Sequence, residues 1–182
     1  MALVKLNARS ATALDATVLT GNLPAISGAS LTGISAGKVA QVIHATSSGS
    51  IDIDSSSSFA DMNLEGVITP SATSSKVLVM FSPRATLAWQ SGTRAFGVSI
   101  ERAISGGATS NVFSSAYNYE VGGSGARTNG TTYLRPQWMK LDSPNSSAEI
   151  TYNIQIKTES SGSVQFNGLN MKSDLILMEV LA

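Results

Sequence analysis

The chain has 182 residues, which is long enough for one domain with its own core and a short appendage. Its 42% of hydrophobic residues excludes a wholly disordered chain, and its 13% of charged residues is well below the usual share of about 25%. Twelve lysines and arginines balance 12 aspartates and glutamates and are scattered singly, which disfavours a nucleic-acid partner. The absence of cysteine excludes disulfides, thiolate metal sites and cysteine nucleophiles.

The first residues do not have the pattern of a signal peptide, because Lys5, Asn7 and Arg9 interrupt the apolar stretch. No apolar run approaches the roughly 20 residues of a membrane helix. We therefore expect no membrane insertion and no export by the secretory route. Assembly in a cytoplasm, followed by lysis of the cell, is one simple route to the outside.

Residues 1–36 are predicted to form an extended segment that does not fold alone. Turn formers such as Gly21, Pro24 and Gly28 interrupt any helix. Ordering about twenty residues costs on the order of 20–40 kcal/mol, and burying its large apolar side chains returns only roughly 10–20 kcal/mol. The segment is thus either a disordered arm or a stalk that sister chains complete. The side chains expected to make these contacts are Leu14, Val18, Leu19, Leu23, Ile26, Leu31 and Ile34.

Residues 37–182 are predicted to form a second, all-β part, because short apolar or alternating stretches lie between Gly, Ser, Asn and Pro turns. The number and spacing of the strands favour an antiparallel β-sandwich of the jelly-roll type, without helices. The expected strands are Val39–Ala45, Ser50–Asp54, Phe59–Thr69, Lys76–Pro83, Arg94–Ala103, Asn111–Tyr119, Thr131–Leu141, Ala148–Thr158, Ser163–Asn167 and Asp174–Leu181.

Three stretches predict where the core lies. In Glu149–Lys157, apolar side chains alternate with polar ones, so one face is expected to point inward. Lys76–Phe81 and Leu175–Met178 are apolar at successive positions, which is typical of central strands buried between two layers.

Leu23–Gly33 (LPAISGASLTG) resembles attachment and shaft segments of bacteriophage tail-fibre proteins. Several later motifs are similar to C-terminal domains of phage proteins: Gly37–Val42, Ile68–Ser71, Ser74–Val79, Leu141–Asn145, Tyr152–Ile156 and Leu175–Glu179. The resemblance implies a homotrimeric virion protein with a jelly-roll head, held to other virion proteins by residues 1–36. It leaves open a tail fibre that binds the host surface or a capsid decoration protein that stabilises the head.

Candidate catalytic groups are few, and we expect neither an enzyme nor a cofactor. His44 is the only histidine, and Gly122–Gly125 lacks the spacing of a nucleophile elbow. Residues 33–38 superficially resemble a phosphate loop but have the wrong spacing. Asp52 and Asp54, with Asp61 or Asp142 added from loops, have the oxygen ligands of a calcium site; a solvated strand edge is the alternative that we favour.

Residues 121–132 are predicted to form a long Gly-rich loop close in sequence to several aromatic residues, and these positions are the candidates for binding a host glycan or protein. The predicted receptor contacts are Arg127, Asn129, Tyr119 and Tyr133. The alternative for the aromatics, which also include Trp89, Trp138 and Tyr117, is a place in the core or in the trimer interface. A polysaccharide-degrading tail enzyme and a cellular carbohydrate-binding module remain as rival hypotheses.

Overall fold

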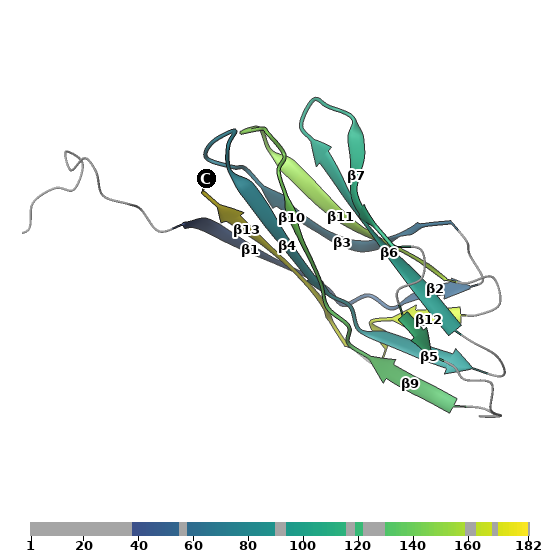
Figure 1. The fold of residues 1–182 in the computed structure, drawn as a ribbon. Coiled ribbons are helices and arrows are strands. Elements are labelled where there is room, and N and C mark those ends of the chain that lie inside the picture. The colour runs from purple at the N-terminus through teal and green to yellow at the C-terminus, as the bar shows by residue number, and fades with distance from the viewer. Residues whose placement is uncertain are drawn as a thin grey trace, which may run out of the picture. The chain divides into compact units, whose positions relative to one another are not determined.

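The computed structural model describes residues 38–54, 58–89, 94–115, 119–121, 130–158, 163–168 and 171–181. These residues contain strands and no α-helix (Figure 1). The strands are β1 (Val39–Ser47), β2 (Ile51–Asp54), β3 (Ala60–Ile68), β4 (Lys76–Ser82), β5 (Ala85–Trp89), β6 (Arg94–Ile104), β7 (Thr109–Ser114), β8 (Tyr119–Val121), β9 (Gly130–Leu134), β10 (Trp138–Asp142), β11 (Ile150–Thr158), β12 (Ser163–Phe166) and β13 (Ser173–Val180).

The strands form two main antiparallel sheets that enclose one core. The first sheet has the order β1-β13-β4-β10, and the second has the order β3-β11-β6-β7, with β8 also paired to β6. The chain passes repeatedly from one sheet to the other, so that its first and last strands are neighbours, which is the connectivity of a jelly roll. The predicted all-β, jelly-roll-like sandwich is therefore confirmed.

The core lies between the inner faces of the two sheets. In β11, Ile150, Tyr152, Ile154 and Ile156 are all fully buried, as the alternation predicted. The apolar strands β4 and β13 are the two central strands of the first sheet, as their continuous hydrophobic runs predicted, but the described residues do not bury their outer side chains beneath a second layer.

A third, smaller sheet has the order β2-β12-β5-β9 and was not predicted. Each of its strands is the continuation of a strand of the first sheet: β1 leads into β2, β4 into β5, β9 into β10 and β12 into β13. The strand order of the first sheet is therefore repeated in the third (Figure 1). The four long strands break together where one sheet ends and the next begins.

The sequence prediction was wrong at these breaks. The single strand expected over 131–141 is two strands, because residues 135–137 include Pro136, which has no N–H for a strand ladder. Pro83 ends β4, but the chain returns to a strand at Ala85, so that β5 was missed. The strand expected over 111–119 is also two strands, β7 and β8.

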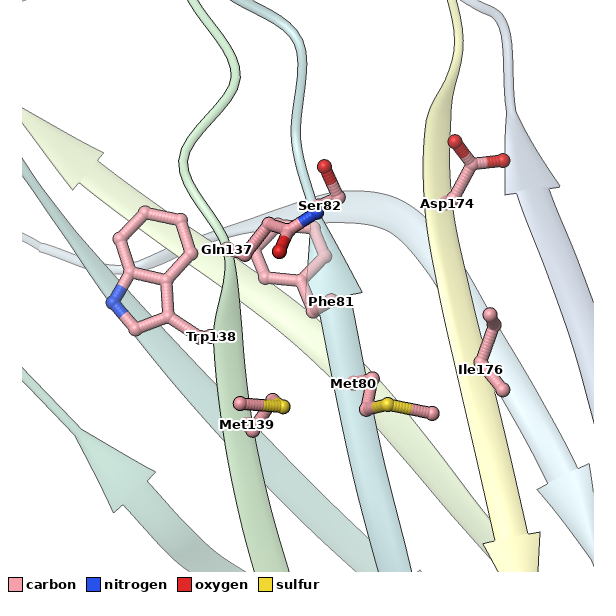
Figure 2. A pocket seen from close by; sticks show the side chains of 8 residues that line it. All are labelled: Met80, Phe81, Ser82, Gln137, Trp138, Met139, Asp174 and Ile176. Carbon is pink, nitrogen blue, oxygen red and sulfur yellow. The ribbon is translucent and has the colours of Figure 1, made fainter.

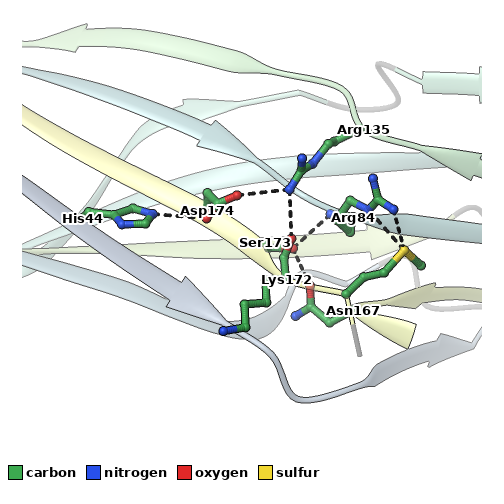
Figure 3. A network of polar contacts seen from close by, with 8 residues as sticks. His44, Arg84, Arg135, Asn167, Lys172, Ser173 and Asp174 are labelled. Carbon is green, nitrogen blue, oxygen red and sulfur yellow. Dashed lines mark hydrogen bonds and ion pairs between the residues drawn. The ribbon is translucent and has the colours of Figure 1, made fainter. Parts of the chain in front are cut away.

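A buried polar cluster holds three of the four breaks together. Asn167 donates its side-chain amide to Ser47 Oγ (3.2 Å) and to the Gly49 carbonyl (3.2 Å). Its Oδ1 accepts from Ser173 Oγ (2.6 Å), which in turn accepts from the Arg84 amide (3.0 Å). Figure 3 shows Ser173 hydrogen-bonded to both Asn167 and Arg84. One asparagine thus connects β1, β4 and β13 where each strand bends.

The two ends of the sandwich differ. Lys38 lies beside the C-terminal end of β13, where the Leu181 amide donates to its carbonyl (2.8 Å). At the opposite end, beyond the third sheet, β2 and β5 end and β9 and β12 begin, since Asp54 pairs with Ser163 and Trp89 with Gly130. The division of the chain at residues 36 and 37 stays a prediction, because residues 1–37 lie outside the described part.

Candidate interaction surface

The outer face of the first sheet is apolar where an exposed sheet would be polar. One row across the four strands contains Val42, Met178, Leu78 and Leu141. The next row contains His44, Ile176, Met80 and Met139. Paired residues of neighbouring strands share a face, so these side chains form one surface, apolar except for His44. We call it the apolar face.

The apolar face is accessible in the single chain. Val42 is 54% exposed, Met139 is 71% exposed and Leu141 is 48% exposed. Soluble proteins seldom expose a contiguous apolar patch without a functional reason. The same strands bury Val79, Phe81 and Leu177 on their inner side, so the first sheet is apolar on both faces.

A shallow hollow of about 140 Å³ lies within this face, at its β10 side. Its apolar lining includes Met80, Met139 and Ile176, and Asp174 stands at its border (Figure 2). An apolar cavity of about 150 Å³ holds a benzene molecule. The hollow therefore has the volume and the chemistry to receive one large apolar side chain.

The outer face of the second sheet is polar. The row of Glu65, Asn153 and Glu101 crosses three of its strands, β3, β11 and β6, and the adjacent row pairs Asp61 with Gln155. A hollow of about 190 Å³ is lined by Glu65, Glu101 and Asn153. The two outer faces therefore differ, and the exposed apolar side chains are concentrated on the outer face of the first sheet.

At the bent edge of the apolar face, Asp174 contacts both His44 and Arg135. Its Oδ1 lies 3.1 Å from His44 Nε2, and its Oδ2 accepts from Arg135 Nη2 at 3.2 Å (Figure 3). In a hydrolytic triad, the histidine nitrogen opposite the carboxylate would face a serine hydroxyl. His44 is a half-exposed strand residue bound to a carboxylate that Arg135 also holds, which is the environment of a surface ion pair.

The acidic residues considered for calcium do not gather. Asp52 accepts from Gln165 in the third sheet (2.9 Å), Asp61 accepts from Asn153 on β3 and β11 (3.0 Å), and Asp142 is on β10. The placement of Asp61 and Asp142 in loops was wrong, because both lie in strands. Among the described residues, no group of three or more His, Asp or Glu side chains is arranged to hold a metal ion. The side chain of Asp54 lies outside the described part.

Asp142 instead connects the two main sheets. Both of its oxygens accept from Arg102 of β6 (2.8 and 3.0 Å), and Oδ2 also accepts from the Tyr152 hydroxyl (2.7 Å). Burial raises the pKa of the Tyr152 phenol, and the hydrogen bond to Asp142 raises it further. Tyr152 therefore stays a neutral donor to a carboxylate, and sequence reasoning missed this link because it joins residues far apart in the chain.

Glu179 forms a second polar link, at the end of the sandwich where Lys38 lies. The side chain is fully buried and accepts from the Ser71 amide and hydroxyl (2.7 and 2.6 Å) and from Gln41 (2.7 Å). Burial raises the pKa of Glu179, but the hydrogen bonds from Ser71 and Gln41 outweigh that effect and lower it to about 2. The buried carboxylate thus fixes the turn between β3 and β4 against β1 and β13.

The structure describes only some of the predicted receptor and stalk residues. Tyr133 on β9 is 57% exposed in the third sheet, as a surface contact requires. Trp138 is half-buried, stacked on Phe81 at 5.7 Å and edge-on to Phe96 at 5.9 Å, so it belongs to the core. Outside the described residues and side chains lie Tyr117, Tyr119, Trp89, Arg127, Asn129 and the stalk candidates Leu14, Val18, Leu19, Leu23, Ile26, Leu31 and Ile34.

These features define the class of the protein: an all-β jelly roll with one apolar outer face and one polar outer face. No helix in the described part of the chain is long and apolar enough to span a bilayer. No family model and no curated protein matches the chain.

Solved structures similar to the chain include particles of infectious bursal disease virus. The VP2 subviral particle has 12% identity and a TM-score of 0.36, and the match covers 78% of this chain and 38% of that chain. The structure of the Gt strain has 13% identity and a TM-score of 0.35, with the same coverage, and the T=1 particles have 11% and 0.36, covering 78% and 36%. This chain spans less than half the length of those chains, and a likeness of this size carries no conclusion about function.

Proposed function

We propose that this protein is a homotrimeric virion protein of the fibre type. Its N-terminal segment attaches it to the particle, and its jelly-roll head presents the opposite end to the host surface. The observation that carries the proposal is that the head has two different ends. The chain enters at the end where Lys38 lies, and the third sheet, with the termini of β2, β5, β9 and β12, lies at the opposite end.

This arrangement suits attachment at one end and contact at the other. The entry end is braced by the buried Glu179 link, and its turn at residues 69–75 is held against β1. The third sheet carries the exposed Tyr133, on the strand that follows the predicted Gly-rich loop with Arg127 and Asn129. Loops on a rigid sandwich commonly carry binding function.

Three joined copies of the head bind the host surface together, so each single contact can be weak. Linked copies bind with an avidity that no single contact provides, provided that all reach the surface together. The resemblance of residues 23–33 to phage fibre segments supports the trimer. The balanced formal charge of 12 cations and 12 anions adds little electrostatic repulsion between copies.

The test uses the full purified chain. We expect a trimer by light scattering at micromolar concentration, and we expect the purified trimer to block adsorption of the parent particle to its host cell. Tyr133→Ala should weaken the blocking, whereas Val67→Ala, at an exposed position of the polar second sheet, should not. A folded monomer contradicts the trimer.

The capsid decoration alternative gives a different result in the same assay. A decoration protein leaves adsorption unchanged and instead rebinds to particles stripped of it, raising the temperature at which they release their genome. That outcome would replace the fibre role and leave the virion role intact. A map of the intact particle then shows whether the protein lies on the head or on the tail.

A further inference from the structure

We infer that the apolar face is covered by other copies of this chain, so that the first sheet of each head faces the trimer axis. The inference rests on the proposed function for the number of copies. Its own evidence is the surface formed by Val42, Met178, Leu78, Leu141, Ile176, Met80 and Met139, which no described part of the chain covers.

The chemistry of the face selects a protein partner. Apart from His44, its outward side chains are aliphatic or thioether groups; Arg135 is paired with Asp174 at one border, and Lys76 lies at the opposite border. A phosphate or an acidic glycan would therefore meet no cluster of cations within the face. A sugar ring would find no aromatic platform, because Trp138 is turned into the core. An apolar protein surface fits, and methionines adapt well to such contacts.

The size of the face agrees with the core of a subunit interface. Four strands at about 4.8 Å spacing and two outward rows, each taking up two residues at about 3.3 Å, give a flat area on the order of 250 Å². A stable interface buries about 800 Å² on each partner and has an apolar centre with a polar rim. Lys76 at one border and the pair of His44 and Asp174 at the other provide such a rim.

The entry point of the chain identifies the partner as a sister copy. Residues 1–37 precede β1, which is an edge strand of the first sheet. If these segments join three copies, they bring the three β1 strands, and with them the first sheets, close to the axis. Joined copies also raise the effective concentration of each face for its neighbours to the millimolar range. A face of modest area is sufficient under that condition.

The test compares the same substitution on the two outer faces. Val42→Glu places a charge on the apolar face, and Val67→Glu places the same charge at a position of similar exposure, 42%, on the polar face. We expect Val42→Glu to convert the trimer to monomers or to raise its dissociation constant at least about 100-fold, a loss of about 2.7 kcal/mol. Val67→Glu should remain trimeric, and circular dichroism should show both variants folded.

A second measurement decides the case in which the N-terminal segments hold the trimer together by themselves. Because the chain has no cysteine, Met139→Cys and Val67→Cys each introduce a single thiol. We expect the thiol at position 139 to react with a maleimide at least about tenfold more slowly than the thiol at 67, and both to react alike in denaturant.

The outcomes separate the two proposals. A wild-type trimer in which Val42→Glu stays trimeric and the thiols at 139 and 67 react equally fast overturns the apolar face as an interface and leaves the trimer standing. A wild-type monomer overturns the trimer, and with it this inference. A slow thiol at 139 in a trimer supports the inference whatever the mass of Val42→Glu.

Discussion

Asn167 illustrates how a single residue holds the bend between the first and third sheets. Its backbone has φ of 55°, a left-handed conformation that asparagine tolerates better than most residues. Its side chain is buried and serves both as donor and as acceptor to strands on either side. A serine or an alanine at this position cannot make the same set of bonds.

We expect Asn167→Ala to lower the free energy of unfolding by about 2–4 kcal/mol. The variant leaves Ser47 Oγ without the donor from Asn167 and the Ser173 hydroxyl without its acceptor, and each buried unsatisfied group costs about 1–3 kcal/mol. Urea unfolding followed by circular dichroism measures the loss. Gln165→Ala, two residues earlier in the chain and only half-buried, is the control and should cost less. An equal loss in both variants would mean that the Asn167 cluster has no special role.

The Glu179 carboxylate makes stability depend on pH in a defined direction. Its pKa is about 2 in the folded chain, against an ordinary value of 4.5. The unfolded chain therefore binds a proton first as the pH falls, and the stability that Glu179 contributes is complete above about pH 4.5 and is lost between pH 4.5 and about 2.

Glu179→Gln should be less stable than the wild type by on the order of 2 kcal/mol at pH 7, since hydrogen bonds to a charged group contribute about 1.5–3 kcal/mol. The difference between the two proteins should narrow as the pH falls from about 4.5 to about 2. Denaturant unfolding at several pH values measures it, with Glu65→Gln as an exposed control. A gap that stays constant over this range would contradict the assignment.

At the scale of elements, the close approach of β3 to β13 sets the thickness of the sandwich. A Cβ atom added to Gly66 would lie 2.9 Å from Leu177 Cδ1 and 3.3 Å from Leu175 Cδ2. Real carbon atoms do not pack at 2.9 Å, so Leu177 must move if Gly66 gains a side chain. The glycine is thus explained by the opposite sheet, and nothing in the local sequence signals it.

We expect Gly66→Val to destabilise the fold by about 1–3 kcal/mol through overpacking. Combining it with Leu177→Ala should cost less than the sum of the two single substitutions, because the smaller side chain makes room for the valine. A double-mutant cycle on unfolding free energies measures this coupling. Strict additivity would show that the two strands do not compete for the same space.

The elements also show how far sequence patterns reach. The alternation in the sequence predicted the buried face of β11, and the apolar runs predicted the central position of β4 and β13. Both predictions are possible because the apolar pattern of a strand follows directly from its residue order. The sequence prediction took Pro83 as the end of a strand and missed the strand β5 that follows it. It also continued a single strand through the break at Pro136. A proline marks an interruption, but only the neighbouring strands decide whether the chain resumes in a second sheet.

At the scale of the whole molecule, the two outer faces assign different surroundings to the two sheets. The polar face with Glu65, Glu101 and Asn153 suits water, and the apolar face with Met139 and Leu141 suits another protein. The strands of the first sheet carry apolar side chains on both sides. From residue order alone, this pattern predicted a central position in a sandwich and did not predict an exposed apolar face. The second apolar side is the signal for assembly.

If the protein is a trimer, its thermal midpoint depends on concentration. Unfolding to separate chains is opposed by mass action, so each tenfold increase in protein concentration should raise the midpoint by on the order of 2–4 °C for a chain of this size. Calorimetry over a hundredfold range of concentration measures the shift. A midpoint that does not change would contradict a trimer that unfolds and dissociates together.

The sequence by itself determined the all-β class, most of the strands and which of them are central, because periodicity and turn residues act over a few neighbours. It also determined that the chain has no thiols and that its lysines and arginines do not cluster along the sequence. Only the tertiary structure decided the third sheet, the links through Asn167, Asp142 and Glu179, and the apolar face. Each of these joins residues of strands far apart in the chain, and their proximity depends on strand order and register, which local pattern does not encode.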